Sequence, residues 1–253
     1  MLKGQFLTDR GKVRDHNEDS GGIFFNADQQ FLAVIADGMG GHKAGDVASQ
    51  MTINNIQTNW EEVSGLTTPE EMENWLFETI RSVNKSLFDH AQSHVECQGM
   101  GTTIVITICT PDFFTVGHVG DSRCYIANEH GFSQVTEDHS LVNALVKAGQ
   151  VSKEDAQNHP RKNVVLKAVG TEQQVEPDVQ SLEWEHGDRL LLCSDGLTDK
   201  LTDEQLSSFV DGNVEMGQAG QQMINLANQL GGEDNISLIL IQHDVSPEEG
   251  ETS

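Results

Sequence analysis

Acidic side chains recur at the ends of short apolar runs in this sequence. They are Asp37 after 31–36, Asp195 after 189–194, Asp234 before 235–242, Asp121 between 113–119 and 122–127, and the pair Glu18-Asp19 near the N-terminus. Runs of this length and composition predict buried strands. The ends of strands can meet at one edge of a sheet, where several unpaired carboxylates would repel one another strongly. A divalent cation removes that repulsion, so the pattern predicts a metal site.

The ligand types indicate which metal would bind. No His or Cys shares these positions, so zinc and copper fit poorly, whereas carboxylates, carbonyls and water suit Mg²⁺ or Mn²⁺. Gly38 allows close approach of the backbone, so its carbonyl oxygen is a further candidate ligand. A single Asp-Gly pair is usually a turn, and Asp211-Gly212 is interpreted in that way.

The motifs of several other chemistries are missing. The stretch 15–19 matches D-x-N-x-D, but Ser20 and Asn26 stand where an EF-hand requires Gly and Glu. The chain contains no GxxxxGK[ST] or GxSxG motif, its glycine-rich stretch 38–45 does not fit GxGxxG, and no Cys is followed six residues later by Arg. Because no protein nucleophile is evident, we expect a metal-activated water to attack. Two ions about 3.5–4 Å apart can lower the pKa of a bridging water and stabilise in-line attack on phosphorus.

Arg14 is the candidate for binding a substrate phosphate. It lies just before Glu18 and Asp19, in a chain with 15 Lys and Arg against 40 Asp and Glu. A guanidinium can hold two phosphate oxygens at once. A surface arginine paired with a carboxylate explains the position equally well, so chemistry alone leaves both interpretations open.

The composition restricts the class of protein and its partners. The net charge of −25 argues against binding to nucleic acid or anionic membranes. No apolar run approaches the roughly 18 residues of a membrane-spanning helix, and the first residues lack the apolar core of a signal peptide. The 4 cysteines form no CxxC pair and are expected to be buried, reduced thiols of a cytoplasmic protein.

The remaining pattern predicts the elements that position these residues. Consecutive strands at 103–109, 113–119 and 122–127 favour antiparallel meanders. Helices are predicted at 45–60, 203–210, 218–230 and from the capping box Thr68-Pro69-Glu70-Glu71 onward. We expect one α+β domain over residues 1–243, with stacked sheets covered by helices, followed by a disordered acidic tail at 244–253.

Several ordered motifs resemble a known family. They are Arg14 to Asp19 (RDHNED), Asp37 to His42 (DGMGGH), Gly99 to Thr103 (GMGTT), Gly120 to Arg123 (GDSR), Ser194 to Leu197 (SDGL) and Asp234-Asn235. Their order and spacing resemble the metal-dependent type-2C Ser/Thr protein phosphatases, the PPM family, in their compact bacterial form. The stretch 138–150, with His159-Pro160 and Asn163, resembles the flap beside the catalytic cleft of that form, and we place the flap at about 138–170.

The resemblance implies a fold, a ligand set and a reaction. The fold is a four-layer α-β-β-α sandwich, with the metals at one end of its two antiparallel sheets. Asp37 would bridge two Mn²⁺ or Mg²⁺ ions, Asp195 and Asp234 would hold one of them, and the Gly38 carbonyl would hold the other. Asp121, with Asp195, matches the ligands of a third, weaker ion, and Arg14 matches the phosphate-binding arginine. Glu18, Asp19 and Asn235 would act mostly through bound water or by supporting the ligands.

One position departs from part of the family. Animal members carry His where this chain has Met39, and that His is proposed to protonate the leaving oxygen; bacterial members commonly share Met. The acid is then a metal-bound water or His42, and a capping or structural role for His42 is an equal reading of that residue.

The function implied is hydrolysis of phosphoserine and phosphothreonine in proteins, opposing a bacterial Ser/Thr kinase. The partners expected are phosphoproteins, including that kinase, and the chain is expected to be a monomer. The alternatives are a catalytically silent module of the same fold that binds phosphoproteins, and an acidic protein that stores metal.

Overall fold

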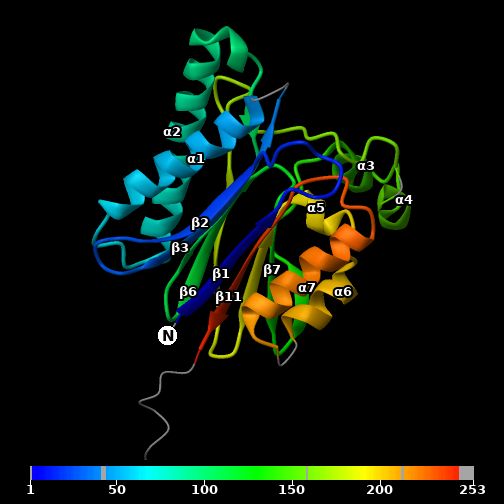
Figure 1. The fold of residues 1–253 in the computed structure, drawn as a ribbon. Coiled ribbons are helices and arrows are strands. Elements are labelled where there is room, and N and C mark those ends of the chain that lie inside the picture. The colour runs from blue at the N-terminus through cyan, green and yellow to red at the C-terminus, as the bar shows by residue number, and fades with distance from the viewer. Residues whose placement is uncertain (1, 41–43, 158, 212–213, 245–253) are drawn as a thin grey trace, which may run out of the picture.

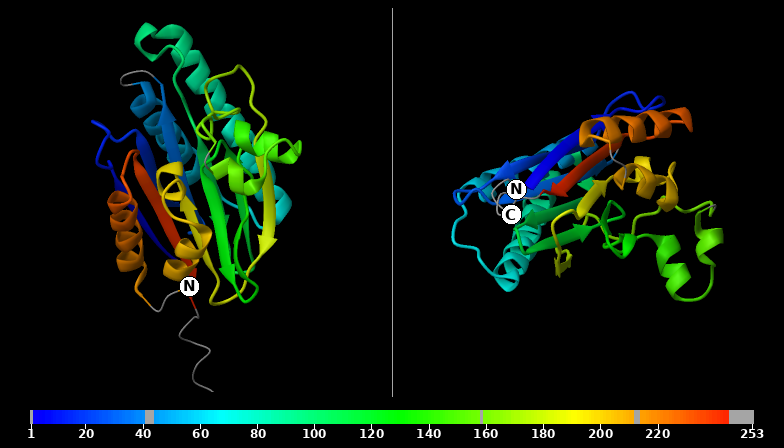
Figure 2. Two further views of the ribbon diagram at one scale, coloured as in Figure 1. Left: turned by 90° about the vertical axis from the view of Figure 1, so that its right-hand side faces the viewer. Right: turned by 90° about the horizontal axis from the view of Figure 1, so that it is seen from below.

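Two antiparallel sheets stacked face to face form the centre of the molecule. In the computed structural model, which describes residues 2–40, 44–157, 159–211 and 214–244, the strand orders are β1-β11-β10-β7-β8 and β2-β3-β5-β6-β9, and the short β4 pairs with β3. Helices α1 and α2 cover the outer face of the second sheet, and α6 and α7 cover that of the first (Figure 1). The four-layer α+β sandwich expected from the sequence is therefore confirmed, and Figure 2 shows its layers from two further sides.

The bounds of the elements are as follows. The strands are β1 (Leu2–Asp9), β2 (Asp19–Phe25), β3 (Phe31–Met39), β4 (Gly101–Thr102), β5 (Ile104–Cys109), β6 (Phe113–Val119), β7 (Arg123–Asn128), β8 (Gly131–Gln134), β9 (Asp178–Glu183), β10 (Arg189–Cys193) and β11 (Ile236–His243). The helices are α1 (Ala44–Glu61), α2 (Pro69–Ser93), α3 (Leu141–Lys147), α4 (Lys153–Gln157), α5 (Asp195–Thr198), α6 (Asp203–Val210) and α7 (Met216–Gln229), with a 3₁₀ turn at Val95–Cys97.

Local sequence signals set several helix ends. Thr68 caps α2 through a complete capping box, in which its hydroxyl accepts from Glu71 N and the Glu71 side chain accepts from the Thr68 backbone. Thr202 and Gln205 form the same box at the start of α6. The helix predicted from the capping box onward is confirmed, and its residues Met72, Leu76, Ile80 and Leu87, which recur at helical spacing, lie buried against the sheet.

The apolar layer between the sheets leads directly to the acidic positions. Alternate residues of β3 face opposite sides: Leu32, Val34 and Ala36 pack under α1 and α2, whereas Phe31, Ala33 and Ile35 join the layer between the sheets. Side chains alternate along a strand, so Asp37 continues the second series. The strand β3 extends to Met39, so Asp37 lies within the strand, whereas the sequence placed it just after the strand.

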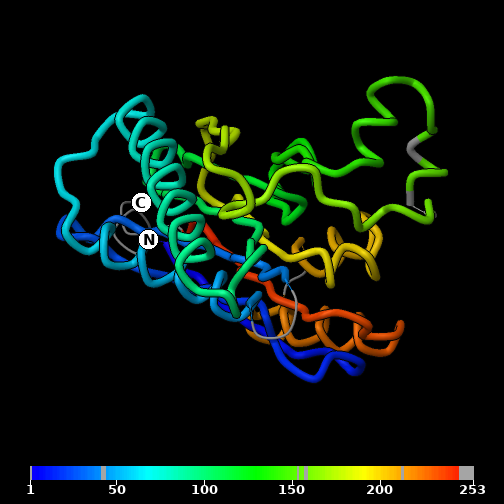
Figure 3. Tube along the Cα trace, turned by 90° about the horizontal axis from the view of Figure 1, so that it is seen from above, coloured from blue at the N-terminus to red at the C-terminus, as the bar shows by residue number. Residues whose placement is uncertain are grey.

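The segment 138–170 lies beside one end of the sandwich. It contains α3 and α4 and extends to one side of the strands and of α5 to α7, in green in Figure 3. Among the described residues no helix is long and apolar enough to cross a membrane. All 4 cysteines are buried and unpaired. Asp244 forms an ion pair with Lys3 at 2.5 Å, and the rest of the predicted acidic tail lies outside the described residues.

Candidate functional site

Two aspartates stand where the layer between the sheets ends. Asp19 on β2 is the direct antiparallel partner of Asp37 on β3, so their side chains share one face. Like charges in directly opposed positions destabilise a sheet. Asp19 is 7% exposed, so its charge is largely removed from water. The fold thus holds two adjacent carboxylates at a place where only a counter-charge would favour both being ionised.

Neighbouring elements bring three more aspartates to the same end. Asp195 is the first residue of α5, directly after β10, and Asp234 lies just before β11, the antiparallel partner of β10. Asp121 follows the end of β6 and is 7% exposed. The sequence prediction that strand ends would gather these carboxylates is supported by this placement.

Close backbone approach explains the glycines that follow two of these aspartates. A Cβ added to Gly196 would lie 1.9 Å from the Asn235 carbonyl oxygen, so only glycine allows α5 to start against the loop before β11. A Cβ on Gly38 would lie 2.3 Å from the Gly45 carbonyl oxygen, at the start of α1. Both Asp-Gly pairs therefore serve packing at the site. Asp211 caps the C-terminus of α6, and Gly212 of the turn expected there lies outside the described residues.

The carboxylates shift one another's pKa values. Burial, followed by repulsion from Asp19 and Asp195, raises the pKa of Asp37 well above its ordinary value. Burial, followed by repulsion from Asp121 and Asp234, does the same for Asp195. Burial is also the main cause that raises the pKa of Asp19 to about 6, against hydrogen bonds from Ser237 and Ser194 that lower it. These shifts show that the aspartates interact as one cluster.

Asp121 belongs to the same electrostatic group but has a different nearest neighbour. Burial and then repulsion from Asp138 raise its pKa to about 6, and its own charge raises the pKa of both Asp37 and Asp195. Asp121 therefore stands between the aspartate cluster and the start of the 138–170 segment.

The cluster could bind a divalent cation, because some of its carboxylate oxygens have no hydrogen-bond partner. Asp19 Oδ1 and Asp195 Oδ1 are buried and have no hydrogen-bond partner. Buried polar atoms are almost always paired, so two carboxylate oxygens without a partner in one cluster fit a site for a positively charged ligand. The donor set consists of carboxylates, which suits Mg²⁺ or Mn²⁺.

Hydrogen bonds orient one of these carboxylates. Asp19 Oδ2 accepts from Ser194 Oγ at 2.9 Å, and Ser194 Oγ in turn accepts from Ser237 N at 3.0 Å. The serine therefore fixes one oxygen of Asp19 and leaves the other, Oδ1, as the unpartnered atom.

Arg14 places a cation against this cluster. Its Nη2 donates to Asp234 Oδ2 at 2.7 Å, and the side chain remains 49% exposed. Glu18 and Asp37 are also close enough to interact with its charge. The contact with Asp234 is the carboxylate pair that one of the two sequence interpretations expected, and the exposure of the guanidinium leaves the phosphate-binding role of Arg14 a prediction.

Asn235 holds the loop that carries Arg14 and Glu18. Its Oδ1 accepts from Glu18 N at 2.8 Å, and its Nδ2 donates to the carbonyl oxygens of Arg10 at 2.8 Å and His16 at 2.9 Å. Both N–H groups of the amide and one acceptor position of its oxygen are thus used by residues 10–18. This arrangement supports a structural role for Asn235 beside the aspartates rather than direct coordination.

Two residues near the site were given no role from the sequence, although Thr103 ends the motif GMGTT. Asp46, in the first turn of α1, has a buried Oδ1 with no partner, and its charge raises the pKa of Glu18 after burial has done so. Thr103 donates its N–H to Asp37 O at 2.8 Å and accepts from Asp37 N through Oγ1 at 3.1 Å. His42, a candidate acid from the sequence, lies outside the described residues.

Comparisons with known proteins assign this arrangement to a family. The family described as "Protein phosphatase 2C" matches residues 10–231. A "Serine/threonine phosphatase stp" of Listeria monocytogenes is 44% identical, with 97% of each chain covered.

Solved structures agree with that assignment. The crystal structure of Stp1, a Ser/Thr phosphatase of Staphylococcus aureus, superposes with a TM-score of 0.92 at 39% identity, covering 97% of this chain and 96% of that one. The catalytic domain of the phosphatase PstP, solved with 2 manganese ions, gives a TM-score of 0.84 at 31% identity over 96% of this chain and 99% of that one. The chain with its cluster of strand-end aspartates therefore belongs to the protein phosphatase 2C family.

Proposed function

We propose that this protein hydrolyses phosphoserine and phosphothreonine monoesters in other proteins at the aspartate cluster. The observation that carries the proposal is the group of buried, mutually repelling aspartates with orphaned oxygens, beside an exposed arginine. The curated and solved relatives, named Ser/Thr phosphatases, support the same reaction class.

The aspartates would hold two Mn²⁺ or Mg²⁺ ions. In this proposal Asp37 contributes to both ions, Asp195 and Asp234 to one, and the Gly38 carbonyl to the other, while Asp121 with Asp195 serves a third, weaker site. When bound, such ions act as Lewis acids and lower the pKa of coordinated water. The two manganese ions of the PstP structure support the number proposed.

The chain's own residues supply binding and order. Arg14 would exchange its contact with Asp234 for two oxygens of the substrate phosphate, because a guanidinium matches that geometry. Asn235 keeps Arg14 and Glu18 in place through the loop 10–18. Met39, at the end of β3, carries no proton to give to the leaving serine or threonine oxygen, so we assign that proton to a water in the site.

Partners and location follow from this reaction. We infer that the substrates include a Ser/Thr kinase whose phosphorylation the protein reverses, and that the protein acts as a monomer in the cytoplasm. The buried, unpaired cysteines support a reducing compartment.

Removal of metal and substitution of Asp37 test the proposal together. The protein stripped with EDTA should lose hydrolysis of a phosphothreonine peptide, and Mn²⁺ should restore it. Asp37→Asn should lower kcat by roughly 10²-fold or more, because the Lewis-acid stabilisation of the transition state is weakened. Asp211→Asn is the matched control, since it changes another Asp-Gly pair at the end of α6 and should leave kcat unchanged.

Three outcomes would count against the proposal. Full activity after verified removal of metal would exclude a metal-dependent reaction. Unchanged activity in Asp37→Asn would remove this cluster from catalysis. Tight binding of the phosphopeptide without turnover by the Mn²⁺-loaded parent would favour a silent binding module instead.

A further inference from the structure

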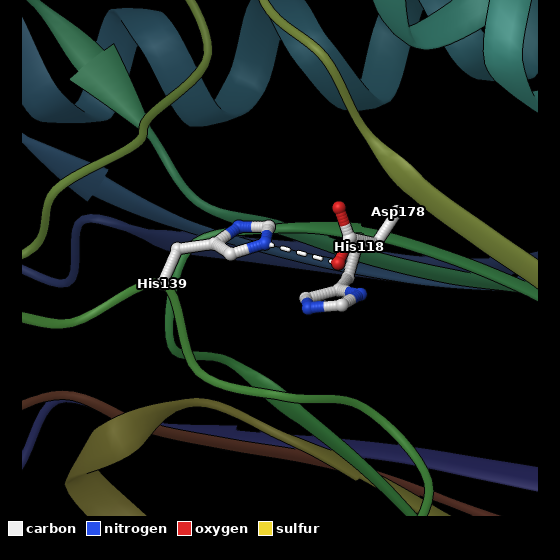
Figure 4. Close-up of side chains that lie close together, drawn as sticks. All are labelled: His118, His139 and Asp178. Atoms are coloured by element: carbon white, nitrogen blue, oxygen red, sulfur yellow. Dashed lines mark ion pairs between the residues drawn. The ribbon is translucent and has the colours of Figure 1, made fainter. Parts of the chain in front are cut away.

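A second group with metal-ligand side chains lies outside the aspartate cluster. His118 on β6, His139 in the loop before α3 and Asp178 at the start of β9 bring one nitrogen or oxygen each within 4.8 Å of one another. Figure 4 shows the His139 ring directed toward Asp178, with His118 beside it. The distance from His139 Nε2 to Asp178 Oδ2 is 3.4 Å.

The geometry of the rings argues against a metal in this histidine group. The two imidazole planes are stacked at an angle of 12°, with centroids 4.7 Å apart. A ligand nitrogen binds a metal in the plane of its ring, and two stacked, nearly parallel planes do not share such a point. His139 Nδ1 also accepts from Gly120 N at 3.1 Å, so it carries no proton. A neutral ring that bound metal through Nε2 would need that proton on Nδ1.

Two hydrogen bonds with His139 fix the position of Gly120. Its ring accepts from Gly120 N, and its backbone N–H donates to Gly120 O at 2.9 Å, so both polar groups of Gly120 are fixed by one residue. Burial, followed by the charge of His118, lowers the pKa of His139, which favours the neutral ring that can accept. Gly120 directly precedes Asp121, and its φ of +113° is a conformation that favours glycine.

Further hydrogen bonds connect the turn 120–123 with the start of the 138–170 segment. Arg123, at the other end of the turn, donates to both carboxylate oxygens of Asp138 at 2.8 and 2.7 Å. The backbone oxygen of His139 accepts from Leu166 N at 2.7 Å, across the 138–170 segment. Residues 138–139 therefore contact both ends of the turn 120–123 and are themselves hydrogen-bonded to Leu166, in the later part of the 138–170 segment.

A chain of hydrogen bonds leads from this turn to Asp37. Ser122 Oγ shares a hydrogen bond with Thr103 Oγ1 at 2.7 Å, and Thr103 bonds both backbone polar groups of Asp37. The position of the turn 120–123 is thus connected with the position of the aspartate at the centre of the cluster.

We propose that His139 is a positioning residue for the reaction, which holds the Asp121 turn in register with the aspartate cluster through its two hydrogen bonds to Gly120. The inference rests on the proposed function of the cluster, because Asp121 is taken to serve a metal there. His139 acts through Gly120 and does not touch the reacting phosphate.

Substitution of His139 by asparagine or by glutamine tests the roles of its two ring nitrogens separately. The Asn Oδ1 can take the place of Nδ1 and accept from Gly120, whereas the Gln amide reaches the position of Nε2 and leaves Gly120 N unpaired. We expect His139→Gln to lower kcat roughly 10-fold and to raise the Mn²⁺ concentration for half-maximal activity by a similar factor, the usual scale for a residue that supports a ligand. His139→Asn should keep most of the parental kcat and a nearly parental Mn²⁺ requirement. In both variants KM for the phosphopeptide should stay within about 2-fold of the parent.

A double-mutant cycle tests whether the effect passes through Asp121. If it does, adding His139→Gln to Asp121→Ala should cause little further loss of kcat, whereas independent roles would multiply the losses. Calorimetric titration with Mn²⁺ should show the tight binding unchanged in His139→Gln. His94→Gln, an exposed histidine at the end of α2, serves as the control that leaves kcat unchanged.

The same assays show how the proposal would fail. Equal losses in His139→Asn and His139→Gln, or independent losses in the cycle, would overturn the role of the Gly120 bond; both amides are polar and similar in size, so a general folding defect would affect them alike. If His139→Gln had parental kinetics while Asp37→Asn was inactive, only the proposed role of His139 would be rejected, and the proposed function of the cluster would stand. An active Asp37→Asn would instead reject the proposed function of the cluster.

Discussion

Two groups of side chains in this molecule have the composition of a metal site, and they differ in how their polar atoms are satisfied. In the histidine group of His118, His139 and Asp178, backbone groups of Glu137 and Gly120 occupy one nitrogen of each ring at 2.8 and 3.1 Å. In the aspartate cluster, Asp19 and Asp195 each keep a buried oxygen without a partner. His139 Nε2 is also buried without a hydrogen bond, but it belongs to a neutral ring and faces Asp178 Oδ2 at 3.4 Å. Ligand types alone would treat the two groups alike, whereas the unpartnered atoms of the aspartate cluster are oxygens of carboxylates that repel one another.

Carboxylates near the two groups also differ in whether a cation balances their charge. Asp138, close to both groups, receives two hydrogen bonds from Arg123, and that pair needs nothing more. Asp37 and Asp195 are surrounded by further aspartates, which raise their pKa values after burial does. Asp138 and Arg123 therefore form a structural pair, whereas in the aspartate cluster Arg14 pairs with Asp234 and leaves the buried carboxylates of Asp37 and Asp195 to repel one another.

Removal of Arg14 would test whether the aspartate cluster binds phosphate as well as metal. Arg14→Ala should raise KM for the phosphopeptide roughly 10-fold with a smaller loss of kcat, because the guanidinium binds the phosphate in the ground and transition states alike. Arg14→Lys should restore little, since the bidentate contact is lost.

The control for Arg14 lies in the same loop. Lys12→Ala removes an exposed cation of equal charge two residues away and should change KM little. Equal effects of Arg14→Ala and Lys12→Ala would assign the change to general electrostatic attraction, and an unchanged KM in Arg14→Ala would return Arg14 to a surface pair with Asp234.

The pH dependence of stability should show a second, smaller effect of the repulsion that sets the aspartate cluster apart from the histidine group. The pKa of Asp19 is raised from 3.8 to about 6 in the fold, so the folded metal-free protein binds more protons than the unfolded chain between these values. Stability of the metal-free protein therefore falls as the pH rises from about 4 to 6 and stays low above that range. Bound Mn²⁺ offsets this loss, so it should raise Tm more at pH 7.5 than at pH 5.5.

Differential scanning fluorimetry of the metal-free protein would measure this effect. We expect Tm to be higher at pH 5.5 than at pH 7.5 by on the order of 5 °C, since about 1 kcal/mol shifts Tm by about 2–4 °C in a chain of this size. Asp37→Asn should reduce the difference, because it removes a carboxylate whose own pKa is raised by burial and then by repulsion from Asp19 and Asp195. An equal difference in Asp37→Asn would attribute it to the net charge of the whole chain.

The sequence predicted the strands that are apolar throughout and missed those that are not. The predicted runs at 113–119 and 189–194 match β6 and β10, which are almost entirely buried. The strands β1 and β2 were not predicted, because their residues are mostly half-buried or exposed and β2 contains Gly21 and Gly22. Edge strands of this kind offer no continuous apolar run for a sequence pattern to detect.

The same limit explains what was predicted of the site. Asp37, Asp195 and Asp234 stand at strand ends, where spacing alone indicates that they converge. Asp46 lies in the first turn of a helix, and its approach to Glu18 depends on the tertiary packing of α1. The role proposed for His139 depends on a bond to the backbone N–H of Gly120, and such a bond leaves no mark on residue types.

The smallest expected effect is that of Asp178→Asn, which tests directly whether the histidine group differs from the aspartate cluster in binding metal. Asp178 completes the histidine group by composition, so Asp178→Asn would remove a ligand if the group bound metal. Its side chain is 55% exposed, and its contacts with His139 at 3.4 Å and Lys167 at 3.8 Å are of the kind that contributes about 0–1 kcal/mol. We expect kcat and the Mn²⁺ requirement to stay within about 2-fold of the parent, and the number of bound Mn²⁺ and Zn²⁺ ions to stay unchanged. Loss of one bound ion in Asp178→Asn, measured by calorimetry and metal analysis, would show that the histidine group is a second metal site and that stacked rings with an occupied nitrogen do not prevent coordination.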